Sequence, residues 1–272
     1  MKKRILAVVL GAVMVMSLAG CGSGTSGEDK KVSSDGEKTY TIGISQFAEH
    51  GSLDNCREGF LAGLEEEGIV EGTNLTVLFD NAQADTGTAS TISDNYVSKK
   101  VNLICAIATP SAMSAYNSTM NTDIPVIYTA VSDPVGSGLV DSLEAPGANI
   151  TGTSDYLDTS SIMKLIQAQN PDVKKIGLLY DVGQDSSTTA IQEAKDYLDE
   201  QGIEYVERTG TTTDEVQLAA EALIADGVDA VFTPTDNTIM TAELSIYEKF
   251  IEAGIPHYTG ADSFALNGAF VD

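Results

Sequence analysis

VNLICAIATPS at residues 101–111 is the clearest structural signal in the chain. The run of residues 101–108 is rich in branched apolar side chains and predicts a strand buried on both faces. Thr109 followed by Pro110 predicts a helix start, with Thr109 as the N-cap and Pro110 at the first helical position. Free backbone N–H groups there, helped by the hydroxyls of Thr109 and Ser111, would suit a carboxylate or phosphate. An ordinary helix cap is the alternative.

A second copy of this arrangement lies further along the chain. The apolar run 228–232 leads into Thr-Pro-Thr-Asp-Asn at 233–237, and a helical pattern follows. Gly43 and Gly177 occupy matching places in two strand patterns, and the segment 124–130 (IPVIYTA) matches 255–261 (IPHYTGA). The order of these features is the same in both halves, which predicts one design used twice.

Strand and helix patterns alternate from Tyr40 onward, with short turns between them. The predicted strands are 40–46, 75–80, 101–108, 124–130, 149–154, 175–180, 204–208, 229–233 and 255–259, and 266–272 begins another extended piece. The predicted helices are 53–67, 86–100, 110–119, 159–169, 188–201, 214–225 and 238–253. This alternation predicts an α/β fold with two doubly wound parallel-sheet lobes, 40–152 and 153–272, facing one another across a cleft.

The amino-terminal region is predicted to lie outside the fold. Residues 1–20 combine a basic start, a short apolar run and a small-residue cleavage site, which together indicate a signal peptide. The site ends at Cys21 and resembles a lipobox, so we expect lipid on Cys21 to anchor the chain at a membrane. The polar segment 21–39 is expected to be a flexible tether.

The net charge and the motifs that the sequence lacks exclude several classes of function. The net charge of −25 argues against a nucleic-acid partner, because phosphates demand a basic surface. Nucleotide-binding, hydrolase and metal motifs are absent from the sequence, and His50 and His257 are the only histidines. We therefore expect no catalysis, cofactor or metal. A disulfide between Cys56 and Cys105 is possible by sequence, but two small buried side chains are the preferred interpretation.

Polar and aromatic groups at the predicted strand ends suit a zwitterionic ligand. A ligand carboxylate would bind near Thr109 and Ser111, and a ligand ammonium would pair with Asp236 or Asp262, or less well with Asp155. Helix capping is an equal alternative for Asp236. Aromatic packing is expected from Phe47 and Tyr128, and also from Tyr156 and Tyr258. The complete candidate ligand-binding set is Gln46, Phe47, His50, Thr109, Ser111, Tyr128, Ser132, Asp155, Asp236, Asn237 and Asp262.

Five segments, in order, resemble one family. They are 44–50 (ISQFAEH) with Leu53-Asp54, 106–112 (AIATPSA), 128–136 (YTAVSDPVG), 149–155 (NITGTSD) and 234–237 (PTDN). Together they are similar to the substrate-binding lipoproteins of ABC importers in the tryptophan/tyrosine-binding (TrpX-like) group. Gly51 departs from this family, whose members often carry Pro there. The family also continues beyond the equivalent of Asp272, so we expect the C-terminal closing segment to be missing.

The resemblance implies a type I periplasmic-binding-protein fold, an aromatic amino acid as ligand, and an ABC permease with its ATPase as partners. It implies a lipid-anchored location on the extracytoplasmic face of the cell membrane. The alternatives are a receptor for a sugar or nucleoside, a sensor that signals to a membrane kinase, and a surface-anchored hydrolase that uses His50.

Overall fold

The computed structural model describes residues 38–270. The predicted signal peptide, the lipidation site at Cys21 and nearly all of the predicted tether lie outside these residues. Among residues 38–270, no helix combines the length and the apolar composition that crossing a membrane requires.

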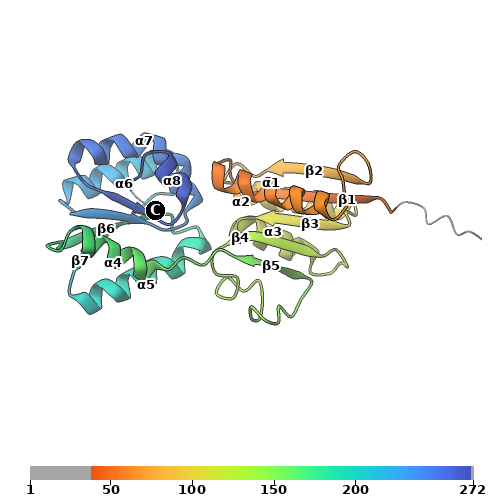
Figure 1. The fold of residues 1–272 in the computed structure, drawn as a ribbon, viewed down its shortest axis with the longest axis horizontal. Coiled ribbons are helices and arrows are strands. Elements are labelled where there is room, and N and C mark those ends of the chain that lie inside the picture. The colour runs from red at the N-terminus through yellow and green to blue at the C-terminus, as the bar shows by residue number, and fades with distance from the viewer. Residues whose placement is uncertain (1–37, 271–272) are drawn as a thin grey trace, which may run out of the picture. The chain divides into compact units, whose positions relative to one another are not determined.

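The first lobe is built on a parallel sheet with strand order β2-β1-β3-β4-β5 (Figure 1). Its strands are β1 (Tyr40–Gln46), β2 (Leu75–Asn81), β3 (Leu103–Ile107), β4 (Val126–Val131) and β5 (Ile150–Ser154). Its helices are α1 (Gly51–Glu66), α2 (Thr86–Ser98) and α3 (Thr109–Thr119). The helices α2 and α3 pack against each other, while α1 contacts β1, β3 and β4. This is the order of a doubly wound sheet, whose ligand sites lie at the carboxyl ends of the strands.

The second lobe repeats this order in a parallel sheet, β7-β6-β8-β9. Its strands are β6 (Lys175–Tyr180), β7 (Glu204–Thr209), β8 (Ala230–Thr233) and β9 (His257–Thr259). Its helices are α4 (Thr159–Gln169), α5 (Asp185–Gln201), α6 (Thr213–Ala225), α7 (Asn237–Ala253) and α8 (Asp262–Leu266). The predicted fold class is confirmed. The boundary between the lobes at residues 152 and 153 stays a prediction, and β5 of the first sheet extends to Ser154.

The matching glycines of the two halves have a shared structural reason. A Cβ added at Gly43 in β1 would lie 2.4 Å from the ring of Tyr96, and one added at Gly177 in β6 would lie 2.8 Å from Leu223. These side chains belong to α2 and α6, which follow the second strand of each lobe. In both lobes, the glycine lets one helix side chain pack directly on the strand backbone.

Both faces of the second sheet are covered by apolar cores. Leu178 packs in a cluster with residues of α4 and α5, while its neighbour Leu179 packs in a cluster with residues of α6 and α7. Successive strand residues point to opposite faces, so a continuous apolar strand needs helices on both sides. The first lobe has one core cluster, in which Ile104 and Cys105 of β3 are fully buried.

Two sequence predictions are wrong. Leu266 belongs to α8, and residues 267 and 268 form a turn with Gly268 at φ 121°, so an extended segment does not begin at Leu266. Thr109 is the first residue of α3 and not its cap. Ala108 takes the cap position instead, because it adopts φ 79° and its carbonyl accepts the hydrogen bond from Ala112 N–H.

Candidate functional site

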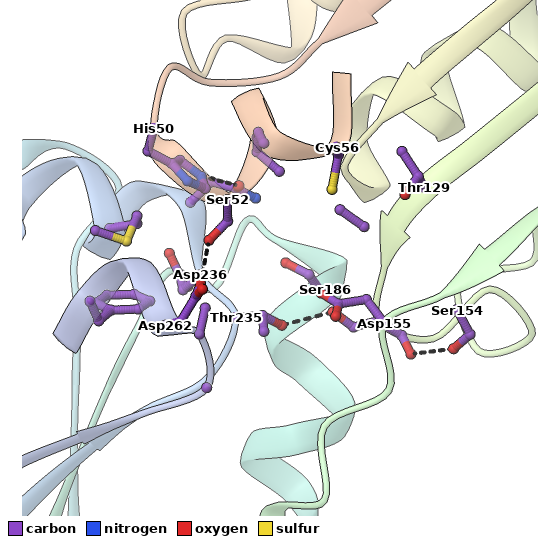
Figure 2. Close-up of a pocket in the computed structure, with 18 of the residues that line it drawn as sticks. His50, Ser52, Cys56, Thr129, Ser154, Asp155, Ser186, Thr235, Asp236 and Asp262 are labelled. Atoms are coloured by element: carbon purple, nitrogen blue, oxygen red, sulfur yellow. Dashed lines mark hydrogen bonds between the residues drawn. The ribbon is translucent and has the colours of Figure 1, made fainter. Parts of the chain in front are cut away.

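A cavity of about 380 Å³ lies between the carboxyl ends of the strands of the two lobes (Figure 2). The first lobe and the segment after β5 contribute His50, Ser52, Leu53, Cys56, Thr129, Ala130, Ser132, Thr153, Ser154 and Asp155. The second lobe contributes Ser186, Thr235, Asp236, Asn237, Met240, Gly260, Ala261, Asp262 and Phe264. A cavity of this size, with polar groups and a few apolar side chains, suits a small molecule.

Hydrogen bonds join the lobes around the cavity. Ser52 N–H donates to the Ser263 hydroxyl at 2.9 Å, and the two hydroxyls of this pair also bond to each other. The Ser132 and Thr235 hydroxyls lie 2.7 Å apart. Outside the cavity, the Thr189 hydroxyl donates to Asp133 at 2.8 Å. These contacts hold the lobes together around the cavity.

The cavity wall is acidic. Asp155 and Asp262 come from the segments that follow β5 and β9, and among the described residues that line the cavity there is no Lys or Arg. Burial, together with the negative charge of Asp262, raises the pKa of the Asp155 carboxyl. Ser52 Oγ donates to Asp262 Oδ1 at 3.1 Å. Two carboxylates that interact, with no Lys or Arg beside them among the described lining residues, favour a cationic group between them.

Asp236 has a different role, because its carboxylate is fully used within the second lobe. It is 1% exposed and caps α7 by accepting from the N–H groups of Thr238 and Ile239, both at 3.0 Å. It also accepts from Asp181 N–H at 2.8 Å, Ser187 Oγ at 2.6 Å and Gln184 Nε2 at 3.2 Å. Burial raises its pKa to about 6, although these hydrogen bonds oppose the rise. Helix capping therefore accounts for the position of Asp236. The carboxylates of Asp155 and Asp262 remain available for a ligand.

His50 reaches across to the second lobe. It precedes α1, and its Nε2 lies 3.2 Å from Asn237 Oδ1 at the start of α7. Its Nδ1 is buried and has no hydrogen-bond partner among residues 38–270. Burial lowers the pKa of His50, so the ring is neutral near pH 7.

The structure brings six of the predicted site residues to the cavity wall and leaves five away from it. His50, Ser132, Asp155, Asp236, Asn237 and Asp262 line it. Gln46 is buried between Arg57 and Asp54, and Ser111 accepts from the Ser45 hydroxyl. Phe47, Tyr128 and Thr109 are buried and do not line the cavity.

The aromatic prediction also needs correction. Tyr156 is 64% exposed and Tyr258 packs in the core beneath the second sheet. Among the described residues, Phe264 is the Phe, Tyr or Trp side chain that lines the cavity, and Leu53 and Met240 also line it. The sequence signal for Phe264 was its place just after the predicted strand 255–259, at the same carboxyl edge as Asp262.

Within residues 38–270, the remaining titratable groups form no metal site and no disulfide. No group of three or more His, Cys, Asp or Glu side chains in the described part of the chain is arranged to hold a metal ion. Cys105 is a buried free thiol in β3, and Cys56 is a half-buried free thiol on the cavity wall. His257, which the sequence predicts to be a partnered strand residue, bonds to Thr233 Oγ1 at 2.9 Å and lies 3.3 Å from Glu243.

Two parallel-sheet lobes with a cavity at their strand ends form the type I periplasmic-binding-protein fold. The chain belongs to the family of ABC transporter substrate-binding proteins, whose family model matches residues 41–272. Membership makes it the extracytoplasmic component that works with an ABC permease.

Relatives support this assignment. The chain is 40% identical to a tyrosine-binding protein of Clostridioides difficile (strain R20291), across 98% of this chain and 77% of that protein. It is similar to a Streptococcus pneumoniae ABC protein solved in complex with L-Trp, with 32% identity, a TM-score of 0.80, and coverage of 85% of this chain and 77% of that one. A ligand-free, open substrate-binding protein with adhesive properties from Clostridium difficile has 37% identity and a TM-score of 0.57, with coverage of 80% and 73%.

The arrangement of the lobes is closer to that of the L-Trp-bound relative than to that of the open relative. Similarity is much higher to the L-Trp complex than to the open protein, although the open protein is the more identical of the two in sequence. The hydrogen bonds between Ser52 and Ser263 and between Ser132 and Thr235 agree with this, because opening the lobes would break them.

Proposed function

We propose that this chain captures an aromatic amino acid between its lobes and delivers it to its permease. The observation that carries the proposal is the carboxylate pair Asp155 and Asp262 in a cavity that has no Lys or Arg among the described residues that line it. An α-ammonium group bound between them would offset the repulsion of the two negative charges. The name of the C. difficile relative and the L-Trp in the S. pneumoniae relative support an aromatic side chain on that ligand.

The rest of the cavity suits the other parts of such a ligand. Leu53, Met240 and Phe264 provide an apolar region. Aromatic contacts with a phenyl ring contribute about 0.5–1.5 kcal/mol beyond area burial, and thioether–aromatic contacts contribute about 0.3–1.5 kcal/mol. The hydroxyls of Ser154 and Ser186 line the cavity and donate over long distances, 3.5 Å to the Ser132 carbonyl and 3.4 Å to Gln184 Oε1, so either could turn to a ligand carboxylate. Micromolar affinity corresponds to about −8 kcal/mol, which a few charge-assisted hydrogen bonds and one buried ring can supply.

The wider role follows from this. Binding shifts the lobes toward the closed form, and the permease recognises that form while an ATPase drives transport. Lipid on Cys21 would keep the receptor at the extracytoplasmic face of the membrane. No catalytic step is part of this proposal. A sugar or nucleoside receptor is less well supported, because neither ligand carries a cation to place between two carboxylates.

Isothermal titration with L-tyrosine and 3-(4-hydroxyphenyl)propionate tests the proposal, because the second compound lacks only the ammonium group. We expect Asp155→Asn and Asp262→Asn each to weaken L-tyrosine binding at least about tenfold, since a hydrogen bond to a charged group contributes about 1.5–3 kcal/mol. The propionate should bind the wild-type protein far more weakly than L-tyrosine does.

Asp158→Asn is the matched control, because Asp158 caps α4 at the surface and does not line the cavity. It should bind L-tyrosine like the wild type. Equal affinity of the wild-type protein for both compounds would contradict the ammonium site.

A further inference from the structure

Ser52, the second residue of α1, makes hydrogen bonds to the first two residues of α8. Its backbone N–H can only donate, and it donates to Ser263 Oγ at 2.9 Å. Its hydroxyl contacts the Ser263 hydroxyl and lies 3.1 Å from Asp262 Oδ1. An ionised carboxylate can only accept, so the Ser52 hydroxyl proton goes to Asp262. The Ser263 proton then goes to Ser52 Oγ, and every proton of the group is used once.

These bonds connect the first lobe to one member of the carboxylate pair. Ser52 belongs to the first lobe and Asp262 to the second, and both residues line the cavity. Figure 2 shows the bond between them beside the cavity. Because the donor and the acceptor come from different lobes, the bond exists only while the lobes lie together.

The Asp262 carboxylate is held differently from that of Asp236. Asp236 accepts its hydrogen bonds from groups of its own lobe, whereas Asp262 accepts from Ser52 of the opposite lobe. Within residues 38–270, no side chain of the second lobe donates to the Asp262 carboxylate. An Asp side chain at the cavity surface with no such bond can adopt several rotamers. Ser52 therefore restricts the direction in which Asp262 points.

This restriction concerns the group that would meet the ligand. Ser52 occupies Oδ1 of Asp262 and leaves Oδ2 for another donor. Asp155 is the second carboxylate of the pair, and it is near enough to Asp262 for their charges to interact. An ammonium group has three donors, so it can serve both carboxylates once they point toward one another.

We propose that Ser52 is a positioning residue for ligand recognition, which holds the Asp262 carboxylate toward the ligand's ammonium group when the lobes come together. This proposal rests on the proposed function and adds that recognition of the ammonium group depends on the contact between the lobes. A contact that only kept the lobes together would strengthen the binding of every ligand by the same factor. A contact that orients Asp262 strengthens ammonium-bearing ligands more than others.

Isothermal titration of the full chain with L-tyrosine and 3-(4-hydroxyphenyl)propionate tests this. The affinity for L-tyrosine divided by the affinity for the propionate measures recognition of the ammonium group, and we call this quotient the ammonium ratio. In Ser52→Ala the ammonium ratio should fall at least about threefold, mainly through weaker binding of L-tyrosine. Ser52→Thr retains a hydroxyl at the same place and should keep most of the wild-type ratio.

Thr189→Val is the matched control for contact between the lobes. It removes the hydrogen bond from Thr189 to Asp133, which also joins the lobes but lies outside the cavity. This change should weaken both ligands by the same factor and leave the ammonium ratio at its wild-type value. Thermal melts of each variant check that it is folded. An equal fall of the ratio in Thr189→Val and Ser52→Ala would overturn the positioning role.

The double variant Ser52→Ala/Asp262→Asn shows whether Ser52 acts through Asp262. Asp262→Asn alone removes the charge that attracts the ammonium group, so adding Ser52→Ala should leave the ammonium ratio unchanged in that background. A second fall of the same size as in the wild-type background would mean that Ser52 acts by another route, and the proposal would be wrong.

The outcomes also separate this proposal from the proposed function. If Ser52→Ala weakens both ligands by the same factor, Ser52 is only a contact between the lobes, and this inference is overturned while the receptor remains. If the wild-type protein binds both compounds equally, the ammonium site fails and this inference fails with it.

Discussion

Replacing Asp236 with alanine should destabilise the protein far more than its position on the cavity wall suggests. The change removes the cap of α7, which is worth about 0.5–2 kcal/mol. It also leaves the Asp181 N–H and the Ser187 hydroxyl, both buried, without their acceptor, at about 1–3 kcal/mol each. The free energy of unfolding should therefore fall by at least about 3 kcal/mol, which in a domain of this size lowers Tm by about 6–12 °C.

The loss of stability in Asp236→Ala should be larger at acidic pH. The folded-state pKa of Asp236 is raised by burial to about 6, above its ordinary value of 3.8, so the folded state binds more protons than the unfolded state between these values. The contribution of this group to stability is fully present below pH 3.8 and is lost as pH rises through 6. The difference in Tm between wild type and Asp236→Ala should therefore be larger at pH 5 than at pH 8.

Thermal melts of the ligand-free protein at both pH values, with urea unfolding at pH 8, measure these effects. Asp158→Ala is the matched control, because Asp158 caps α4 from an exposed position and its removal leaves no buried donor unpaired. It should lower Tm less than Asp236→Ala does. A Tm change of under about 2 °C for Asp236→Ala would refute the assignment of its carboxylate to the second lobe.

Three other predictions concern packing, a buried pair and the thiols. Gly43→Ala should lower the free energy of unfolding by about 1–3 kcal/mol, because its Cβ would overlap the Tyr96 ring, whereas Gly59→Ala has open space in α1 and should be neutral or stabilising; urea unfolding of both variants checks this. His257→Leu should lower the free energy of unfolding by about 3–5 kcal/mol, because it leaves the buried Glu243 carboxylate unpaired. Adding Glu243→Leu should recover part of that loss. A double variant less stable than His257→Leu alone would show that the unpaired carboxylate is not the cause of the loss. Cys56 should react with a thiol reagent faster than Cys105, whose pKa burial raises to about 12, and a bound amino acid should slow Cys56 because that thiol lines the cavity; equal rates in labelling followed by mass spectrometry would contradict the burial difference.

The fold could be predicted from sequence because its signals are local and repeated. The bounds of β1, β6 and α4 match those expected from apolar patterning and from Pro171 after the helix. Matching glycines and proline-containing strand starts marked the two lobes. Thr109 was predicted wrongly because Ala108 adopts a positive φ, which ordinary propensity rules do not anticipate.

The sequence predicts that the site lies at the carboxyl ends of the strands, but not which residues there face the cavity. Asp155 and Asp262 were found because loops after parallel strands meet at one edge of a sheet. Gln46 and Phe47 share that edge, yet Gln46 turns inward to Arg57 and Phe47 into the core, and sequence does not show which way a loop residue points. The His50–Asn237 contact joins residues 187 positions apart, so only the three-dimensional structure reveals it.

A thermal-shift screen of the full chain against the twenty amino acids, with sugars and nucleosides beside them, tests the central claim most directly. Ligand that binds only the native state stabilises it by about 2.7 kcal/mol at a hundredfold excess over Kd, which raises Tm by about 5–10 °C in a domain of this size. The account predicts a rise with Trp, Tyr or Phe and none with the sugars or nucleosides. A rise with a sugar or nucleoside, and none with any aromatic amino acid, would contradict it.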